Sequence, residues 1–376
     1  MKIIPVASGK GGVGKSSLAA NLAVLLAAKG KVILVDADLG SSNLHLLLGM
    51  RRIDKGIGSF LTGNSSENLA SYLMATGYDN LQFIPGDSGI PGMANIDFAK
   101  KKALINQLLK LEADYLIIDL GAGSAFNTLD FFLISNAALL VTSPTAAAAL
   151  SAYLFLKNAV FRIITASFPA GSAGYNLMEE LKKGNLNLQY IDISKLKTEL
   201  AKVDSQNYAE FERLLNNFNP MLVVNMLSEP SEAARAERLK ASCLQHLGVK
   251  LELLGVVFRD DSQNKALAGG LPVVRYKPQG VMSRALMRIA TKLEEAVTKH
   301  EGNLLNTENL AKEPLTTTEV EEDYRVKAEG VADLYINEAI SEGDMLETLR
   351  VQQYELNQLR KENRYLKHKI VELMKK

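Results

Sequence analysis

The chain carries an eight-residue glycine-rich loop close to its first residue, Gly9-Lys10-Gly11-Gly12-Val13-Gly14-Lys15-Ser16. The loop matches the pattern G-x-x-x-x-G-K-[ST], follows a short apolar run at residues 3–7 and precedes an amphipathic helical pattern that starts at Ser17. The pattern needs this order, because glycines let backbone N–H groups point at phosphate oxygens and the helix adds its positive end. The sequence therefore predicts a phosphate-binding loop in an α/β fold; a glycine-rich turn without a ligand is the alternative.

Residues of this loop have distinct chemical uses. Lys15 is suited to bridge the β- and γ-phosphates of a nucleotide, and the Ser16 hydroxyl is suited to ligate Mg²⁺. Pro5, in the preceding apolar run, is disfavoured inside a central strand, so we expect the hydrogen-bonded strand to start late. We expect the nucleotide to contact Gly9, Gly11, Gly12, Val13, Gly14, Lys15, Ser16 and Ser17.

Short apolar runs and helical patterns alternate from residue 2 to about residue 300. The runs are continuously apolar, which is typical of strands buried on both faces of a parallel sheet. Strand–helix alternation predicts a doubly wound, mostly parallel sheet flanked by helices. Helical patterns cover residues 17–29 and 100–111, and the predicted strands are residues 32–35, 81–84, 115–118, 138–141, 221–224 and 254–257.

The composition is that of a soluble globular chain, with 376 residues, of which 47% are hydrophobic and 23% charged. A net charge of +1 gives no overall attraction to nucleic acid or anionic lipid. Cys243 is the only cysteine, so neither an intrachain disulfide nor a four-cysteine metal site can form, and the four histidines show no metal-ligand spacing. The sequence shows no signal-peptide pattern and no run of about 18 apolar residues, so we expect a cytoplasmic protein without a membrane span.

Two stretches interrupt the strand–helix rhythm. Residues 163–219 are charged and mostly helical in pattern, which predicts a helical insertion between two strands of the sheet. Residues 301–330 hold eight acidic and three basic residues and predict a solvated linker. The predicted organisation is a phosphate-binding domain at residues 1–300, this linker, and a C-terminal helix at residues 331–376.

A second lysine inside the loop, Lys10, narrows the class of protein. The loop resembles the deviant Walker A loop of the MinD/ParA superfamily of P-loop ATPases, which belongs to the SIMIBI class. Further matches follow in family order within residues 1–300: Val35-Asp36-Ala37-Asp38-Leu39-Gly40, Ile117-Ile118-Asp119-Leu120-Gly121-Ala122-Gly123 and Val223-Val224-Asn225. The resemblance implies that the chain binds ATP and Mg²⁺, hydrolyses ATP, and forms a homodimer with ATP at the interface.

The resemblance also implies which residues act on ATP. Lys10 reaches across the dimer interface to the phosphates bound by the partner, Lys15 acts within its own loop, and Asp38 orients the attacking water. These three are the implied catalytic residues. Asn225 is implied to read the adenine base, with a plain turn as the alternative.

The implied magnesium ligands are Ser16, Asp36 and Asp119. A carboxylate at the end of a strand, such as that of Asp119, can hold the Mg²⁺ shell. Asp36 would support either Mg²⁺ or Lys15. N-capping of the next element is the alternative use of Asp36 and Asp38, because aspartate is a common N-cap residue.

Residues 114–132 resemble most closely the FlhG/FleN subgroup of MinD-like ATPases, which regulates flagellar number. This resemblance implies an ATP-dependent switch that controls the number or position of flagella together with the SRP-type GTPase FlhF. The alternative is a ParA-like partitioning ATPase that binds DNA non-specifically as a dimer. A scaffold with vestigial hydrolysis is a third hypothesis.

Apolar residues repeat every seven positions near the end of the chain, which predicts a coiled coil from about residue 345. One row contains Leu349, Leu356, Asn363 and Ile370, and the other contains Met345, Gln352, Leu359, Leu366 and Leu373. A helix folded back onto the ATPase domain is the alternative. Residues 360–376 hold seven basic and two acidic residues, so a peripheral contact with the inner membrane, at the cell pole or elsewhere, or with DNA is a further hypothesis.

Overall fold

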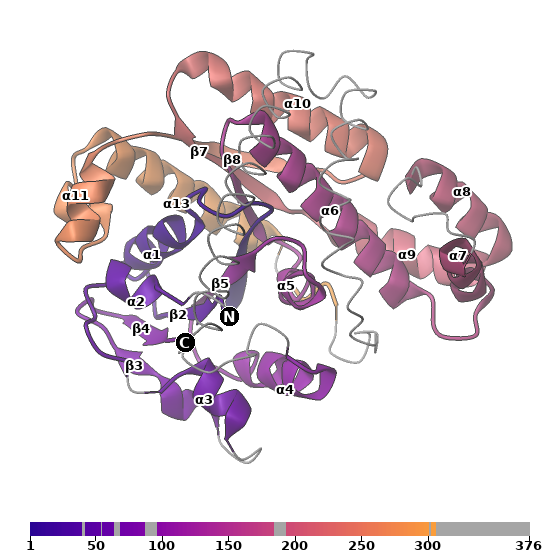
Figure 1. Cartoon of the computed structure of the whole chain (residues 1–376), viewed down its shortest axis with the longest axis horizontal. Helices are drawn as coiled ribbons and strands as arrows, with labels where there is room; N and C mark the ends of the chain where they lie inside the picture. Colours follow the sequence, from indigo (N-terminus) through magenta and orange to yellow (C-terminus); the bar gives the residue numbers. More distant parts are fainter. Residues whose placement is uncertain are drawn as a thin grey trace, which may run out of the picture.

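A computed structural model describes residues 1–39, 42–53, 55–63, 68–86, 96–183, 193–300 and 302–305. Its sheet has eight strands in the order β3-β4-β2-β5-β1-β6-β7-β8, and only β3 runs antiparallel to its neighbour (Figure 1). The predicted doubly wound, mostly parallel sheet is therefore confirmed. The strands are β1 Lys2–Ser8, β2 Val32–Ala37, β3 Met74–Ala75, β4 Leu81–Ile84, β5 Tyr115–Ala122, β6 Leu139–Thr142, β7 Met221–Leu227 and β8 Glu252–Phe258.

The prediction that Pro5 delays the first strand is wrong. β1 begins at Lys2, and Pro5 pairs in register with Ile118 of β5. On its other side, the register of β1 with β6 starts at Val6, one residue after the proline. Pro5 therefore lies in a part of β1 that is paired on one side only, where a missing N–H is tolerated as it is in an edge strand.

Helices cover both faces of the sheet, because alternate residues of each strand point to opposite sides. Ile33 and Val35 belong to one buried cluster, whereas Val32 and Leu34 belong to the other. One face is covered by α1 Lys15–Leu26, α2 Leu44–Leu47, α11 Ser262–Ala268, α12 Val273–Tyr276 and α13 Val281–Lys299. The other is covered by α3 Ile57–Thr62, α4 Phe98–Leu108, α5 Phe126–Phe132, α6 Ala146–Ser167 and α10 Ala234–Ser242.

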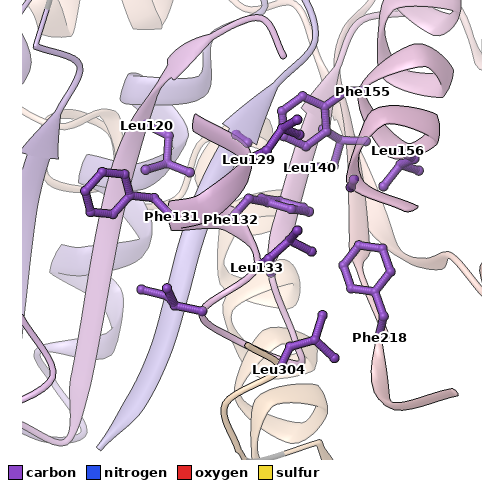
Figure 2. Close-up of a cluster of buried hydrophobic side chains, with 14 of the residues drawn as sticks. Leu120, Leu129, Phe131, Phe132, Leu133, Leu140, Phe155, Leu156, Phe218 and Leu304 are labelled. Atoms are coloured by element: carbon purple, nitrogen blue, oxygen red, sulfur yellow. The ribbon is translucent and has the colours of Figure 1, made fainter. Parts of the chain in front are cut away.

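Aromatic side chains fix α5 against α6 on the second face (Figure 2). The rings of Phe132 and Phe155 meet edge to face with centroids 4.9 Å apart, and Phe218 approaches Phe132 at 6.2 Å. Both arrangements are favourable for aromatic pairs. The segment between β5 and β6 is thus anchored in the core immediately after the end of β5.

Three helices occupy the interval between α6 and β7: α7 Ala173–Lys183, α8 Ile193–Val203 and α9 Ser205–Asn217. They lie together at one side of the molecule, beyond α6 (Figure 1). Leu196, Leu200, Phe211 and Leu214 are buried and continue the core of the second face, so these helices pack on the domain. The antiparallel edge strand β3 was not predicted, since two residues give no readable periodicity.

One described helix, α6, is long and apolar enough to cross a membrane, with a mean hydropathy of 1.4. In the fold, 67% of that helical window is buried. It contacts β6, α5, α9 and α10. We therefore interpret α6 as a core helix.

The predicted linker lies almost entirely outside the described residues, and the predicted C-terminal helix with its coiled coil lies outside them altogether. Both stay predictions.

Candidate functional site

The sequence-predicted residues gather where β1, β2, β5 and β7 end. Parallel strands point their carboxyl ends to one edge, and that edge is where open α/β sheets bind ligands. The glycine-rich loop leaves β1 at Ser8 and enters α1 at Lys15. Asp36 of β2 stands in register with Asp119 of β5, so two carboxylates from distant motifs become neighbours.

Two glycines give the loop its shape. Gly12 and Gly14 have φ values of +79° and +83°, in the left-handed region that side chains disfavour. Gly9 is needed for another reason, because a Cβ there would lie 2.1 Å from the carbonyl oxygen of Ser151 on α6. The loop is thus held against α6 at its start and bent by glycines before α1.

Lys15 extends from the start of α1 to β5. Its Nζ lies 2.6 Å from Oδ1 of Asp119, and both side chains are buried. The hydroxyl of the adjacent Ser16 lies 3.4 Å from the same Nζ. Lys15, Ser16 and Asp119 therefore lie together, and their phosphate and magnesium roles stay predictions.

Asp36 shapes the loop that follows β2. Its Oδ1 accepts from the backbone N–H of Asp38 at 3.2 Å, and its Oδ2 accepts from the Ser42 hydroxyl at 2.7 Å and from the Leu44 N–H at 3.1 Å. Burial raises the pKa of Asp36 to about 7, and the neighbouring Asp119 adds to the rise. Leu44 is the first residue of α2 and Asn43 is its N-cap residue, so Asp36 accepts from the first N–H of the helix without being its N-cap. The magnesium role of Asp36 and its alternative stay predictions.

Asp38 lies just past the end of β2 and faces β5. Its Oδ1 is 3.6 Å from the place that a Cβ on Gly121 would occupy. The negative charge of Asp38 also contributes to the raised pKa of Asp119, although burial is the larger cause. Asp38 is therefore close to the Lys15–Asp119 pair, in a position compatible with orienting water.

Asn225 contacts the phosphate loop directly. Its Nδ2 donates to the carbonyl oxygen of Val13 at 2.9 Å, and the side chain is buried. The same Nδ2 lies 2.3 Å from the place that a Cβ on Gly14 would occupy. In this structure Asn225 therefore supports the loop, which is more than a plain turn residue does, and its reading of adenine stays a prediction.

Lys10 lies in the loop and is half-buried. Its predicted partner is on a second protomer, and the structure contains one chain. The role of Lys10 across an interface stays a prediction.

The donor set fits Mg²⁺ that arrives with a nucleotide. Within the described residues, no group of three His, Cys, Asp or Glu side chains is placed to hold a metal alone. Mg²⁺ in phosphate sites typically takes one or two carboxylates and completes its shell with phosphate oxygens and water. Oδ2 of Asp119 and Oγ of Ser17 are buried and have no hydrogen-bond partner in the described part of the chain, so both have capacity for a ligand.

Several supporting residues carry no pattern that predicts their role from the sequence. Ser42 holds Asp36 in place, but a serine in a loop carries no distinctive pattern. Asn158 of α6 donates to the Ser124 hydroxyl at 2.9 Å, beyond the end of β5. With Ser151 against Gly9, this contact makes α6 a support for two of the site's loops.

A glycine-rich loop between β1 and α1, with its lysine paired to an aspartate on an adjacent strand, defines a P-loop nucleotide-binding protein. Residues 4–273 match the CobQ/CobB/MinD/ParA nucleotide binding domain family, and the chain belongs to that family. It is a P-loop ATPase of this family, as the motifs predicted.

The chain is similar to curated relatives and to solved structures. The flagellum site-determining protein YlxH of Helicobacter pylori is 34% identical over 50% of this chain and 68% of its own length. The antiactivator FleN of Pseudomonas aeruginosa is 27% identical over 56% of this chain and 80% of its own. The septum site-determining protein MinD of Pyrococcus horikoshii, complexed with Mg-ADP, shares the fold, with a TM-score of 0.53, 22% identity and coverage of 80% of this chain and 98% of its own.

Proposed function

We propose that the chain is an ATP-dependent dimeric switch that controls the number or position of flagella. It binds ATP with Mg²⁺ at the P-loop and hydrolyses ATP to ADP and phosphate. Support for the flagellar role comes from the relative YlxH, which is called a flagellum site-determining protein. The resemblance of residues 114–132 to the FlhG/FleN subgroup agrees with it. A protein partner such as an FlhF-like GTPase belongs to the same proposal.

The observation that carries the ATPase part is the buried Lys15–Asp119 pair beside Asp36. Mg²⁺ bound with ATP would neutralise negative charge on the phosphates. Lys15 offers three N–H donors to phosphate oxygens, and Ser16, Asp36 and Asp119 offer oxygen ligands. Asp38 can accept a hydrogen bond from the attacking water and so fix its direction.

The switch part of the proposal rests on the loops around the site. The loop after β2 is tied to Asp36 through Ser42 and Leu44, and the loop after β5 is tied to α6 through Ser124. Loops of this kind can be ordered by contacts with the γ-phosphate and released after hydrolysis. Such a change would alter the surface that a partner binds. We propose that Lys10 completes the site of the partner protomer, so that only the ATP-bound dimer presents the active surface.

We propose that residues 1–300 are the ATPase domain, with a helical insertion at residues 163–219. We propose that residues 301–330 are the linker and that residues 331–376 are a C-terminal helix with a coiled coil from about residue 345. The protein would act in the cytoplasm and at the periphery of the inner membrane or cell pole.

The ATPase part is tested by phosphate release from purified protein. Lys15→Ala should lower ATP turnover by at least about 100-fold, because a positioned charge at the phosphates is lost. Lys110→Ala, an exposed lysine after α4, is the matched control and should keep full turnover. Unchanged turnover in Lys15→Ala would sink the assignment.

The flagellar part is tested in the source organism by counting and locating flagella in single cells. Deletion and an Asp38→Ala chain should both change the number or position of flagella, and the natural chain should restore them. Normal flagella in the deletion strain would reject this role. If ATP-dependent, salt-sensitive DNA retention appears instead, the partitioning alternative is supported.

A further inference from the structure

Residues 262–292, which run from the start of α11 into α13, carry six basic side chains and no acidic one. All six are exposed. Such segregation is unusual in a chain whose net charge is only +1. We call the exposed side of this segment the basic face; its cations are Lys265, Arg275, Lys277, Arg284, Arg288 and Lys292.

The basic face also exposes apolar side chains. Ten large hydrophobic side chains are exposed in the described residues, and half of them lie in this short segment. Val281 is 67% exposed, which is more than any of the others. The five are Leu267, Leu271, Tyr276, Val281 and Met287. An exposed group of this size, mixed with charges of one sign, indicates a binding surface.

The helices that carry the basic face pack on one another and on α1. α11 contacts α12, and α12 contacts α13 and α1. Figure 1 shows α11 and α13 next to α1. The backbone N–H of Val274 donates to Oδ1 of Asn21 at 3.0 Å, which fixes α12 to α1. Arg284, Arg288 and Lys292 follow each other at four-residue spacing, so they lie in one row on α13.

Two acidic residues precede this segment in the sequence and two follow it: Asp260, Asp261, Glu294 and Glu295. Asp260 accepts from the N–H of Ser262 at 2.8 Å, which holds the start of α11. Glu294 accepts from the Tyr115 hydroxyl at 2.8 Å and pairs with Lys29. Asp261 and Glu295 are exposed, so the acidic residues stand at the two ends of the basic face and not between its cations.

The sequence contains a segment with the complementary composition. Residues 331–344 carry four acidic residues and no basic one, together with the apolar Val331, Leu334, Tyr335, Ile336 and Ile340. Residues 306–330, which connect this segment to the described chain, add seven acidic and three basic residues. We propose that the basic face is the docking surface for residues 331–344 of the same chain.

The length of the connection permits this contact. Leu305 is fixed by its N–H bond to the carbonyl oxygen of Leu133, at 3.1 Å. α13, which carries the basic row, ends at Lys299, and its 19 residues span about 28 Å. The connection must therefore reach back over a distance of this order. Residues 306–330 can extend to roughly 80 Å and as a coil have an end-to-end distance of roughly 28 Å. A tether of this length gives an effective concentration on the order of millimolar, which favours contact within one chain over contact with another molecule.

The test is carbodiimide cross-linking of the full chain, without nucleotide, followed by mass spectrometry. The reagent joins carboxylates to lysines that touch them. Asp333, Glu338, Glu342 and Asp344 should join Lys265, Lys277 and Lys292 at least about fivefold more than the exposed lysines 100, 110 and 250. In a mixture of unlabelled and ¹⁵N-labelled chains, both peptides of each cross-link should carry the same isotope, because the contact is within one chain. Addition of 1 M salt should lower the yield of these cross-links.

Arginine variants separate specific docking from general reactivity, because arginine does not react and the lysine reporters stay intact. Arg284→Glu with Arg288→Glu should lower the cross-links at least about fivefold. When Glu338→Arg and Glu342→Arg are added to this double variant, the cross-links of Asp333 and Asp344 should be restored. Lys202→Glu with Arg213→Glu, a surface reversal on α8 and α9, should leave the cross-links unchanged.

Several outcomes would overturn the docking. They are no excess over the control lysines, mixed-isotope pairs, or no effect of the arginine reversals. Binding of the full chain to phosphatidylglycerol vesicles or to DNA through Arg284 and Arg288, without excess cross-links, would assign the face to that ligand instead. The inference does not rest on the proposed function, since the measurement uses neither ATP nor hydrolysis.

Discussion

The side-chain amide of Asn225 donates a hydrogen bond to the carbonyl oxygen of Val13, 212 residues earlier in the chain, at 2.9 Å. Asn225 is buried at the end of β7, and it also fills the space beside Gly14. β7 therefore takes part in shaping the phosphate loop, although the loop belongs to β1 and α1. The contact links β7 to the loop that follows β1, although β6 lies between these two strands in the sheet.

Gly14→Ala should destabilise the chain, because two effects act on one residue. The left-handed φ of +83° strains a side chain, and the new Cβ would lie 2.3 Å from Nδ2 of Asn225. We expect the free energy of unfolding to fall by about 1–3 kcal/mol. Gly11→Ala is the matched control, since its Cβ would meet nothing within 4 Å, and it should cost less than about 0.5 kcal/mol. Urea unfolding of both proteins is the measurement, and equal losses would contradict the argument.

The sequence made the sheet and the loop predictable for physical reasons. Strands buried on both faces must be apolar at consecutive positions, so β2, β4 and β5 were readable without any partner. The phosphate loop could be predicted because the backbone geometry of such a loop requires its glycines and Lys15 at fixed positions. The prediction for Pro5 failed, because it assumed pairing on both sides along the whole of β1.

Contacts between distant segments were not predictable in this way. The support of Val13 by Asn225 and of Gly9 by Ser151 depends on where β7 and α6 pack, which no local pattern encodes. Ser42 acts on Asp36 through a loop without periodicity. A charged residue within an apolar run, such as Asp130 between Leu129 and Phe131, was a signal that could have been used, since buried charges need partners.

Asp36 should make stability depend on pH in metal-free and nucleotide-free protein. Its pKa is about 7 in the folded chain, because of burial and the nearby Asp119, and 3.8 is the ordinary value. Between these values the folded chain binds more protons than the unfolded chain, so the free energy of unfolding falls as the pH rises. Urea unfolding at pH 5 and pH 7.5 measures this slope. Asp36→Asn should reduce it, while the exposed control Asp261→Asn should keep it; a slope that survives Asp36→Asn would assign it elsewhere.

A buried ionic cluster should dominate the stability of α5. Asp130 is fully buried and accepts from Arg162 through Nε at 2.6 Å and Nη2 at 3.1 Å, and it also pairs with Lys101. Asp130→Leu removes the buried carboxylate that Lys101 and Arg162 share. We expect this change to lower the free energy of unfolding by about 3–5 kcal/mol in guanidinium unfolding.

The triple variant Asp130→Leu, Lys101→Met and Arg162→Met is the comparison for that experiment. It removes the charges together and replaces them with apolar side chains. Its loss should be smaller than that of Asp130→Leu alone, since the cations are removed together with the carboxylate. A triple variant that is less stable than the single one would show that the ion cluster itself stabilises α5.

Lys10 and Asp38 should have opposite effects on the oligomeric state, if the site is completed by a second protomer. Asp38→Ala should bind ATP without turnover and accumulate as a dimer, with twice the 41.0 kDa of the chain, in saturating ATP and Mg²⁺. Lys10→Ala should bind ATP and stay monomeric, because the charge that would reach the partner's phosphates is removed. Light scattering after gel filtration measures both, with Lys100→Ala as an exposed control that dimerises like the natural chain. A monomeric Asp38→Ala chain would contradict the shared site, and a dimeric Lys10→Ala chain would show that another contact holds the protomers together.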